Sequence, residues 1–228
     1  MKKTVIFAII VLAGLLGLSA GPNLLPNGNF DEGEGKAANW ETPDGFTSFW
    51  VMDKDRGRIL KMDTRIDRDQ VIEWWAKRKI DSTIKPPVPI IPAEPLKAIG
   101  NETTEGVALD SIMIPVKPGQ NYKLSVDYKG NLSPIIWIKG FRKHPRKDYY
   151  TNSYQTRLVP AGGKKDEWKT YSIGFNPTAR TPETIKMKVR IHSFWPVGIY
   201  YFDNVRVEDI TPEEMAELVK KRAEVTDK

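Results

Sequence analysis

The chain of 228 residues carries 35 Lys and Arg against 29 Asp and Glu, has a formal net charge of +6, and contains two histidines and no cysteine. The lack of cysteine excludes disulfides and thiol catalysis, and two histidines are too few for a multi-histidine metal centre. The charge is lower than that of a typical nucleic-acid-binding protein, and the length suffices to bury a core without cross-links.

Residues 1–20 have the pattern of a secretory signal peptide. Lys2 and Lys3 precede an apolar run from Thr4 to Leu18, and small residues follow. This order is typical of a cleaved leader, and the run is short for a membrane span of about 20 residues. We therefore predict a secreted, periplasmic or extracellular protein that is not embedded in a membrane after cleavage. Export also argues against a nucleic-acid partner.

Alternation of apolar and polar residues dominates from Arg58 onward and predicts short strands separated by turn residues. No helical pattern interrupts these strands, so we predict an all-β fold, an antiparallel β-sandwich or jelly roll over residues 21–209. The predicted strands are 58–64, 70–76, 107–114, 121–128, 134–141, 154–159, 168–175, 184–192 and 198–207.

Two segments depart from this alternation. A connection over about 77–105 contains five prolines from Pro86 to Pro95, which favour an extended conformation. A connection of this length is either a functional insertion or one without a role. In the tail 210–228, Thr211 is placed as an N-cap, Pro212 as the first helical residue and Glu214 for a capping box. The tail is therefore predicted to form a short C-terminal helix.

The two ends of the predicted domain resemble one family. The segments NLLPNGNFDEG near the start and GIYYFDNVRVED near the end resemble carbohydrate-binding modules of families four, nine and twenty-two, which are galactose-binding-like jelly rolls. Three internal segments, SIMIPVKPGQNYKLSVDYKG, DEWKTYSIGF and VRIHSF, resemble the family's strands in the same order. The window 77–105 has no counterpart in that pattern. The resemblance also implies that Leu24, Leu25 and Phe30 anchor a first strand in the core.

The resemblance implies a structural calcium site between the two ends. Calcium prefers six to eight oxygen ligands, and carboxylates with backbone carbonyls in glycine-rich turns supply them. The alternative is that the carboxylates are ordinary turn and strand-end residues. The implied ligands are Asp31, Asp55 and Asp203, with the carbonyl groups of Asn29 and Arg58.

Candidate ligand residues are aromatic and polar side chains on the polar sides of strands, because sugars stack on aromatic rings and hydrogen-bond to neighbouring groups. In the predicted strand 70–76, Ile72 and Trp74 are expected in the core; in 134–141, Trp137 shares its face with Lys139. The alternative for each tryptophan is a place in the core. The resulting candidates are Glu73, Trp75, Trp137, Tyr150, Arg157, His192 and Trp195; the resemblance places Arg157 and His192 near family ligand positions.

The charge of these segments favours an acidic ligand. The run Lys139–Tyr150 carries several cations, and Lys186, Lys188 and Arg190 lie on the polar side of their strand. If these surfaces are continuous, the ligand is an acidic polysaccharide, such as a uronate or sulfated polymer, and not a neutral glucan or xylan. The alternative is a run of solvated loop residues.

We therefore predict a non-catalytic carbohydrate-binding domain. No nucleophile elbow or phosphate-binding loop occurs, and no second carboxylate accompanies Glu73 for glycoside hydrolysis. Two alternatives remain: a structural or adhesion domain that binds another protein, and a polysaccharide lyase that uses His192 or His144 with Tyr150 and Arg157.

Overall fold

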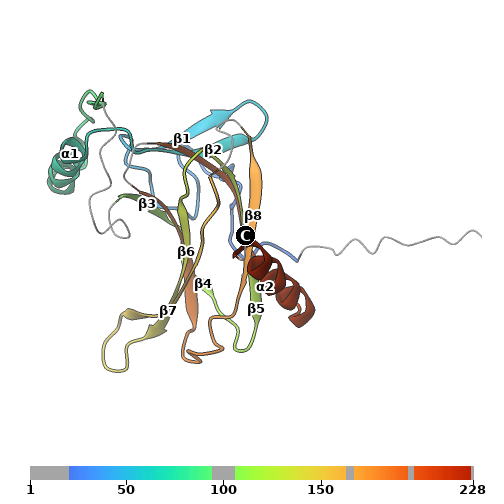
Figure 1. Ribbon diagram of the computed structural model, residues 1–228. Helices are drawn as coiled ribbons and strands as arrows, with labels where there is room; N and C mark the ends of the chain where they lie inside the picture. The colour runs from blue at the N-terminus through green and yellow to red at the C-terminus, as the bar shows by residue number, and fades with distance from the viewer. Residues whose placement is uncertain (1–20, 94–105, 163–166, 195–197, 227–228) are drawn as a thin grey trace, which may run out of the picture.

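The computed structural model describes residues 21–93, 106–162, 167–194 and 198–226. Within them, two antiparallel sheets stack into a β-sandwich, with orders β1-β2-β10-β5-β8 and β3-β9-β6-β7, and β4 also pairs with β9 (Figure 1). The all-β prediction is confirmed. The strands are β1 Ser48–Asp53, β2 Gly57–Asp63, β3 Gly106–Asp110, β4 Ile114–Pro115, β5 Asn121–Lys129, β6 Ile135–Lys143, β7 Tyr150–Leu158, β8 Lys169–Phe175, β9 Lys186–Phe194 and β10 Ile199–Ile210.

Period-two alternation places the core between the sheets. On β9, Met187, Val189 and Ile191 have no exposed surface, whereas the alternating cations face outward. Tyr122 and Tyr128 on β5 and the β6 residues Ile136 and Ile138 are buried in the same way. Each sheet therefore turns its apolar side inward and leaves one face to solvent.

Two of the corrections to the strand predictions concern strands β1, β3 and β4. The predicted strand 107–114 is divided, because β3 ends at Asp110 and β4 begins at Ile114. Strand β1 was missed, although it pairs with β2 along its whole length. Its sequence, SFWVMD, alternates weakly, since apolar residues occupy adjacent positions.

The N-terminal segment is anchored in the core, but it forms turns and no strand. Leu25 and Phe30 have no exposed surface. Asn27 and Phe30 adopt positive φ angles of 53° and 61°, and Asn27 Oδ1 accepts a hydrogen bond from Glu32 N at 2.9 Å. Backbone hydrogen bonds join the segment to β10, from Leu24 N to the Val207 carbonyl oxygen and from Val205 N to the Gly28 carbonyl oxygen. The predicted first strand is therefore wrong, while the predicted anchoring is right.

The predicted strand 70–76 is wrong: these residues lie in helix α1, Arg68–Ile80. The Asp67 side chain caps it by accepting from Gln70 N at 2.9 Å, and three cations occupy the last turn. Trp74 is buried as expected, but Ile72 is 43% exposed, because helical spacing turns it away from the core. Helix α1 projects from one end of the sandwich (Figure 1).

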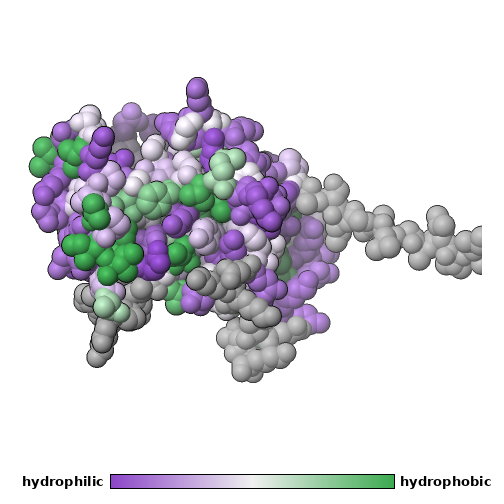
Figure 2. All heavy atoms as spheres, turned by 90° about the horizontal axis from the view of Figure 1, so that it is seen from above, coloured by the Kyte–Doolittle hydropathy of each residue, from purple (hydrophilic) through white to green (hydrophobic). Residues whose placement is uncertain are grey.

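The described part of the proline-rich insertion, residues 81–93, runs back along α1. Gln70 holds it through two hydrogen bonds of 2.8 Å, to the Val88 carbonyl oxygen and from Ile90 N. Residues 94–105 of the insertion lie outside the described residues. Figure 2 shows apolar side chains gathered over this end of the molecule. The exposed aliphatic residues of α1 and of the described part of the insertion are Ile72, Ile80, Val88, Ile90 and Ile91, which we call the aliphatic patch.

The C-terminal helix is confirmed as α2, Pro212–Thr226. Thr211 and Glu214 form the predicted capping box, with Thr211 N donating to Glu214 Oε2 at 2.9 Å and Glu214 N to Thr211 Oγ1 at 3.2 Å. Met215 and Leu218 lie directly over Gly174 of β8, where a Cβ would come within 2.5 Å of the Met215 sulfur. Among the described residues, no helix is long and apolar enough to span a membrane.

Candidate functional site

The outer face of the sheet β3-β9-β6-β7 gathers most of the predicted ligand residues of the strands. Cross-strand pairing places Trp137 of β6 opposite Arg190 on one side and Arg157 on the other, and Arg190 pairs with Asp110 of β3. Two residues along β6, on the same face, Lys139 lies between Lys188 and Gln155. We call this surface the Trp137 face; its residues are Asp110, Trp137, Lys139, Gln155, Arg157, Lys186, Lys188, Arg190 and His192.

A buried carboxylate organises the cations of this face. Asp110 is 2% exposed and accepts hydrogen bonds from Arg190 Nε at 2.5 Å, from Arg190 Nη2 at 2.8 Å and from Lys188 Nζ. Burial works to raise the pKa of Asp110, but the hydrogen bonds and charges of Arg190 and Lys188 outweigh it and hold the pKa below its ordinary value. Asp110 was not among the predicted site residues, although it continues the outward side of its strand.

Trp137 is half-buried on the solvent side of β6, and its neighbours Ile136 and Ile138 face the core, as predicted. The Arg157 guanidinium carbon lies 5.7 Å from the Trp137 ring centroid. Lys139, two residues along β6, has a pKa lowered by burial and by the positive charge of Arg190. The face therefore combines the Trp137 ring with closely spaced cations that repel one another.

His192 lies on the predicted side of β9 but is only 6% exposed, so the expected open imidazole is not found. It pairs across the strands with Ala108 and Ile135. Burial, and then the charges of Arg190 and Lys139, lower the pKa of His192 to about 4. The imidazole is therefore neutral at neutral pH, with its protonated form disfavoured by the same cations that line the face.

The other candidate ligand residues that the structure describes do not lie beside Trp137. Glu73 and Trp75 lie on α1, where Glu73 pairs with Lys77 at 2.6 Å and Trp75 Nε1 donates to Asp44 Oδ2 at 2.7 Å. Tyr150 pairs with Lys143 at the hairpin end of β6 and β7, six residues from Trp137, or about 20 Å at the rise of a strand. Its ring meets the far end of the Trp137 face, where Lys186 Nζ lies 4.5 Å from the ring centroid. Trp195 lies outside the described residues.

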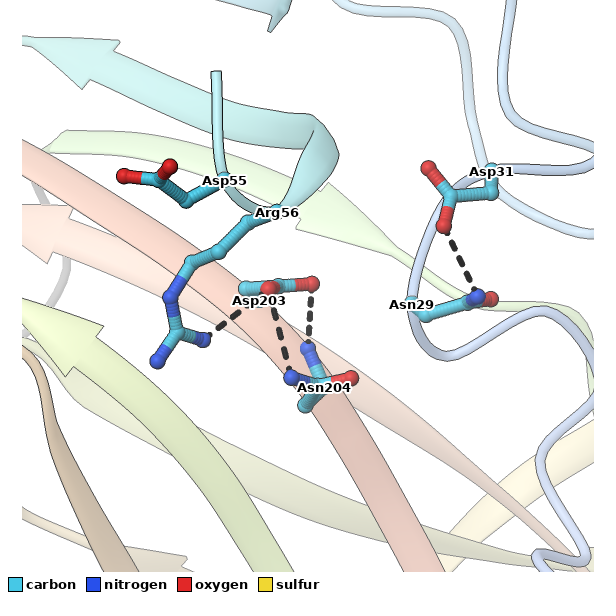
Figure 3. Close-up of a pocket in the computed structure, with 6 residues that line it drawn as sticks. All are labelled: Asn29, Asp31, Asp55, Arg56, Asp203 and Asn204. Atoms are coloured by element: carbon cyan, nitrogen blue, oxygen red, sulfur yellow. Dashed lines mark hydrogen bonds and ion pairs between the residues drawn. The ribbon is translucent and has the colours of Figure 1, made fainter. Parts of the chain in front are cut away.

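A second polar site lies at one edge of the other sheet, where four of the five predicted calcium ligands line one pocket of about 520 Å³. Figure 3 shows Asn29, Asp31, Asp55 and Asp203 around it, together with Arg56 and Asn204. Arg58 is not among the lining residues. Its backbone N–H donates to Asp31 Oδ1 at 2.8 Å, and the second oxygen of Asp31 accepts from Asn29 Nδ2 at 3.0 Å.

As these side chains lie, they do not fit a calcium ion. The guanidinium group of Arg56 contacts Asp127 Oδ2 at 2.7 Å and Asp203 Oδ2 at 3.0 Å, so a protein cation already neutralises these carboxylates. Asp203 is 2% exposed, and burial raises its pKa despite the guanidinium. Within the described ranges, no group of three or more His, Asp or Glu side chains is arranged to hold a metal ion.

The architecture is thus that of a two-sheet β-sandwich with a cationic, tryptophan-bearing face. Neither a protein-family model nor a curated protein matches the chain. Among solved structures, it is similar to "Family 16 Carbohydrate Binding Module-2", at 14% identity and a TM-score of 0.46, covering 81% of this chain and 99% of that chain.

Two further solved structures are similar to this chain at comparable levels. One is TmCBM61 in complex with β-1,4-galactotriose, with 13% identity, a TM-score of 0.43, and coverage of 83% of this chain and 99% of that one. The other is the CBM22-1 xylan-binding domain from Paenibacillus barcinonensis Xyn10C, with 10% identity, a TM-score of 0.42, and coverage of 84% and 97%. At these identities and TM-scores, the ligand of this chain has to be argued from its own residues.

Proposed function

We propose that this protein is an exported, non-catalytic domain that binds a polysaccharide on the Trp137 face. The observation that carries the proposal is the row formed by Arg190, Trp137 and Arg157 across three neighbouring strands. The indole supplies an apolar surface for a sugar ring, and the flanking guanidinium groups supply donors for hydroxyl or carboxylate oxygens.

The charge of the face supports an acidic polysaccharide. Its five cations are Lys139, Arg157, Lys186, Lys188 and Arg190, and Asp110 is the one carboxylate among the residues that define it. Burial, and then the charge of Arg190, lower the pKa of Lys139, and an anionic ligand would offset that charge. A uronate or sulfated polymer therefore matches the face better than a neutral glucan or xylan.

The geometry supports binding over the lyase alternative. His192 pairs with Ile135 and Tyr150 with Lys143, which are eight residues apart on β6, or about 26 Å at the rise of a strand. His144 lies in the hairpin next to Tyr149 and is as remote from Arg157 as Tyr150 is. These groups are too far apart to act on one sugar residue.

Affinity electrophoresis with polygalacturonate, alginate, xylan and β-glucan tests the proposal. Trp137→Ala should weaken retardation by an acidic polymer at least about tenfold, equivalent to about 1.4 kcal/mol. Tyr149→Ala removes an aromatic ring that is 47% exposed in the β6–β7 hairpin and serves as the matched control. Retardation by neutral polymers alone would overturn the acidic ligand, and equal binding by both variants would overturn the site.

The calcium ion implied by the resemblance stays a prediction. Its support is that Asp31, Asp55 and Asp203 line one pocket, and binding would require Arg56 to leave Asp203. Thermal melting with and without a chelator tests it: a lower midpoint in chelator supports calcium, and an unchanged midpoint removes it.

A second candidate function, binding of another protein, is favoured by the aliphatic patch. Val88 is 85% exposed and Ile90 58% exposed, and exposed apolar patches often mark interaction surfaces. With a partner purified from the native source, Val88→Ser with Ile90→Ser should abolish the complex, whereas Trp137→Ala should leave it intact. Retention of the complex by the double serine variant would exclude this patch.

A further inference from the structure

The outer face of the opposite sheet carries a row of alternating aromatic and cationic side chains, one from each strand or its immediate end. Phe49 of β1 pairs with Lys61 of β2, Lys61 with Tyr201 of β10, and Tyr201 with Lys129 of β5. Tyr128 pairs with Lys169, so the same register places Lys129 beside Trp168, the residue before β8. We call Phe49, Lys61, Tyr201, Lys129 and Trp168 the Trp168 row.

Contacts between the side chains show that the row is continuous. Lys129 Nζ lies 4.8 Å from the Tyr201 ring centroid and 5.0 Å from that of Trp168, and Lys61 Nζ lies 5.6 Å from the Phe49 centroid. All five side chains are half-buried on the solvent side of the sheet, while the alternate residues Leu60, Tyr128 and Phe202 face the core. The row therefore exposes aromatic rings that the core does not use.

The carboxylates near the row are already paired, which leaves its charge positive. Asp63 accepts from Arg65 Nε at 2.9 Å and from Arg65 Nη2 at 2.7 Å, although Lys61 Nζ is also within 3.7 Å. Asp127 and Asp203 are held by Arg56, whose guanidinium carbon lies 4.3 Å from the Trp168 ring centroid. Among the described residues, Lys129 is paired with aromatic rings and with no carboxylate.

We infer that the Trp168 row is a second polysaccharide-binding surface, separate from the Trp137 face, and that its ligand is an anionic polysaccharide whose acidic and uncharged sugars alternate. Uncharged sugars would stack on Phe49, Tyr201 and Trp168, and the acidic groups would pair with Lys61 and Lys129. The inference does not rest on the function proposed for the Trp137 face, because the two surfaces belong to different sheets.

The spacing of the row carries the choice of ligand. Neighbouring strands lie about 4.8 Å apart, so successive side chains of the row are separated by about the length of one sugar residue in an extended chain. Aromatic rings recur on every second strand, about 10 Å apart, and this distance corresponds to a disaccharide repeat. Cross-strand aromatic and lysine pairs also stabilise a sheet, but stability alone requires no continuous alternation over five strands.

Isothermal titration with hyaluronan decasaccharides, in which glucuronate and N-acetylglucosamine alternate, tests the inference. Lys129→Gln should weaken binding at least about fivefold and Trp168→Ala at least about tenfold, while Trp137→Ala should change it less than about twofold. Lys169→Gln is the matched control, since it removes the same charge one residue from Trp168 outside the row. Thermal melting of each variant establishes that it is folded.

Three outcomes would overturn the inference. Polygalacturonate, with an acidic group on every sugar, could bind the row as tightly as hyaluronan, which would remove the alternating ligand. Oligothymidylate could bind in its place, with the loss in the same variants, which would make the row a nucleic-acid surface. Loss of hyaluronan binding in Trp137→Ala but not in Lys129→Gln would assign the polysaccharide to the Trp137 face alone. Failure of acidic polymers at the Trp137 face would leave the inference intact.

Discussion

The two solvent faces of the sandwich carry similar residue types in different arrangements. On the Trp137 face, the buried Asp110 holds two of the five cations, Lys188 and Arg190, side by side. Other cations of the face also lie over rings, as Lys186 does 4.5 Å from the Tyr150 ring centroid. In the Trp168 row, each of the two lysines lies beside an aromatic ring, and the nearby carboxylates are engaged by arginines outside the row. The first arrangement suits a concentrated acidic group on a ligand, and the second suits a repeating chain. Composition alone does not separate the two cases, since both faces combine tryptophan with lysine or arginine.

The largest expected effect concerns the carboxylate of the Trp137 face. Asp110→Asn should lower the free energy of unfolding by about 3 kcal/mol, because it leaves Lys188 and Arg190 adjacent and uncompensated over a buried position. Urea denaturation measures the change. Asp69→Asn, at a carboxylate whose side chain is 88% exposed beside Arg68, should change it by less than about 0.5 kcal/mol. Equal effects of the two variants would show that Asp110 does not organise the face.

The next effect is a pH dependence that only the Trp137 face should show. Because the folded pKa of His192, about 4, lies below the unfolded value of about 6.5, the unfolded chain binds the proton more readily. His192 should therefore cost about 2 kcal/mol of stability as pH falls from 7.5 to 5, and almost nothing above pH 7.5.

The comparison of wild type with His192→Gln isolates this contribution, since the carboxylates titrate in both proteins. Unfolding free energies at pH 7.5 and pH 5 should differ less in the variant. The same pH dependence in both proteins would mean that folding does not lower the pKa of His192.

A smaller loss is expected from the arginine beside the Trp168 row. Arg56→Gln should lower the free energy of unfolding by about 1 to 2 kcal/mol, because Asp203 and Asp127 lose a shared donor and Trp168 loses its stacked guanidinium group. Lys54→Gln, in the same β1–β2 turn with an 88% exposed side chain, is the control. Indistinguishable stabilities of the two variants would contradict a stabilising role for Arg56.

The smallest expected effect is the coupling between the two faces. The core separates them, so the stability changes of Trp137→Ala and Trp168→Ala should add within about 0.5 kcal/mol in the double variant. Thermal or urea denaturation of the four proteins gives the coupling energy. A larger value would show that the faces communicate through the sheets and are not independent surfaces.

The residues that alternate regularly in the sequence were the ones whose structure could be predicted. Strand β9 and the helix α2 were both found, because a period-two pattern and a capping box are local signals. The strand predicted at 70–76 failed because its short apolar run fits either period, and the Asp67 cap and terminal cations of the helix α1 were not weighed.

The sequence by itself determined the sandwich class, the outward side of β6 that carries Trp137 and Lys139, and the anchoring of Leu25 and Phe30. Only the tertiary structure decided that His192 is buried, that Arg56 pairs with Asp203, one of the carboxylates expected to bind calcium, and that Phe49 and Trp168 belong to one row. The physical reason is the order of strands in the sheets. Neighbours such as β2 and β10 are remote in the chain, and the charge or ring that each residue meets depends on that pairing.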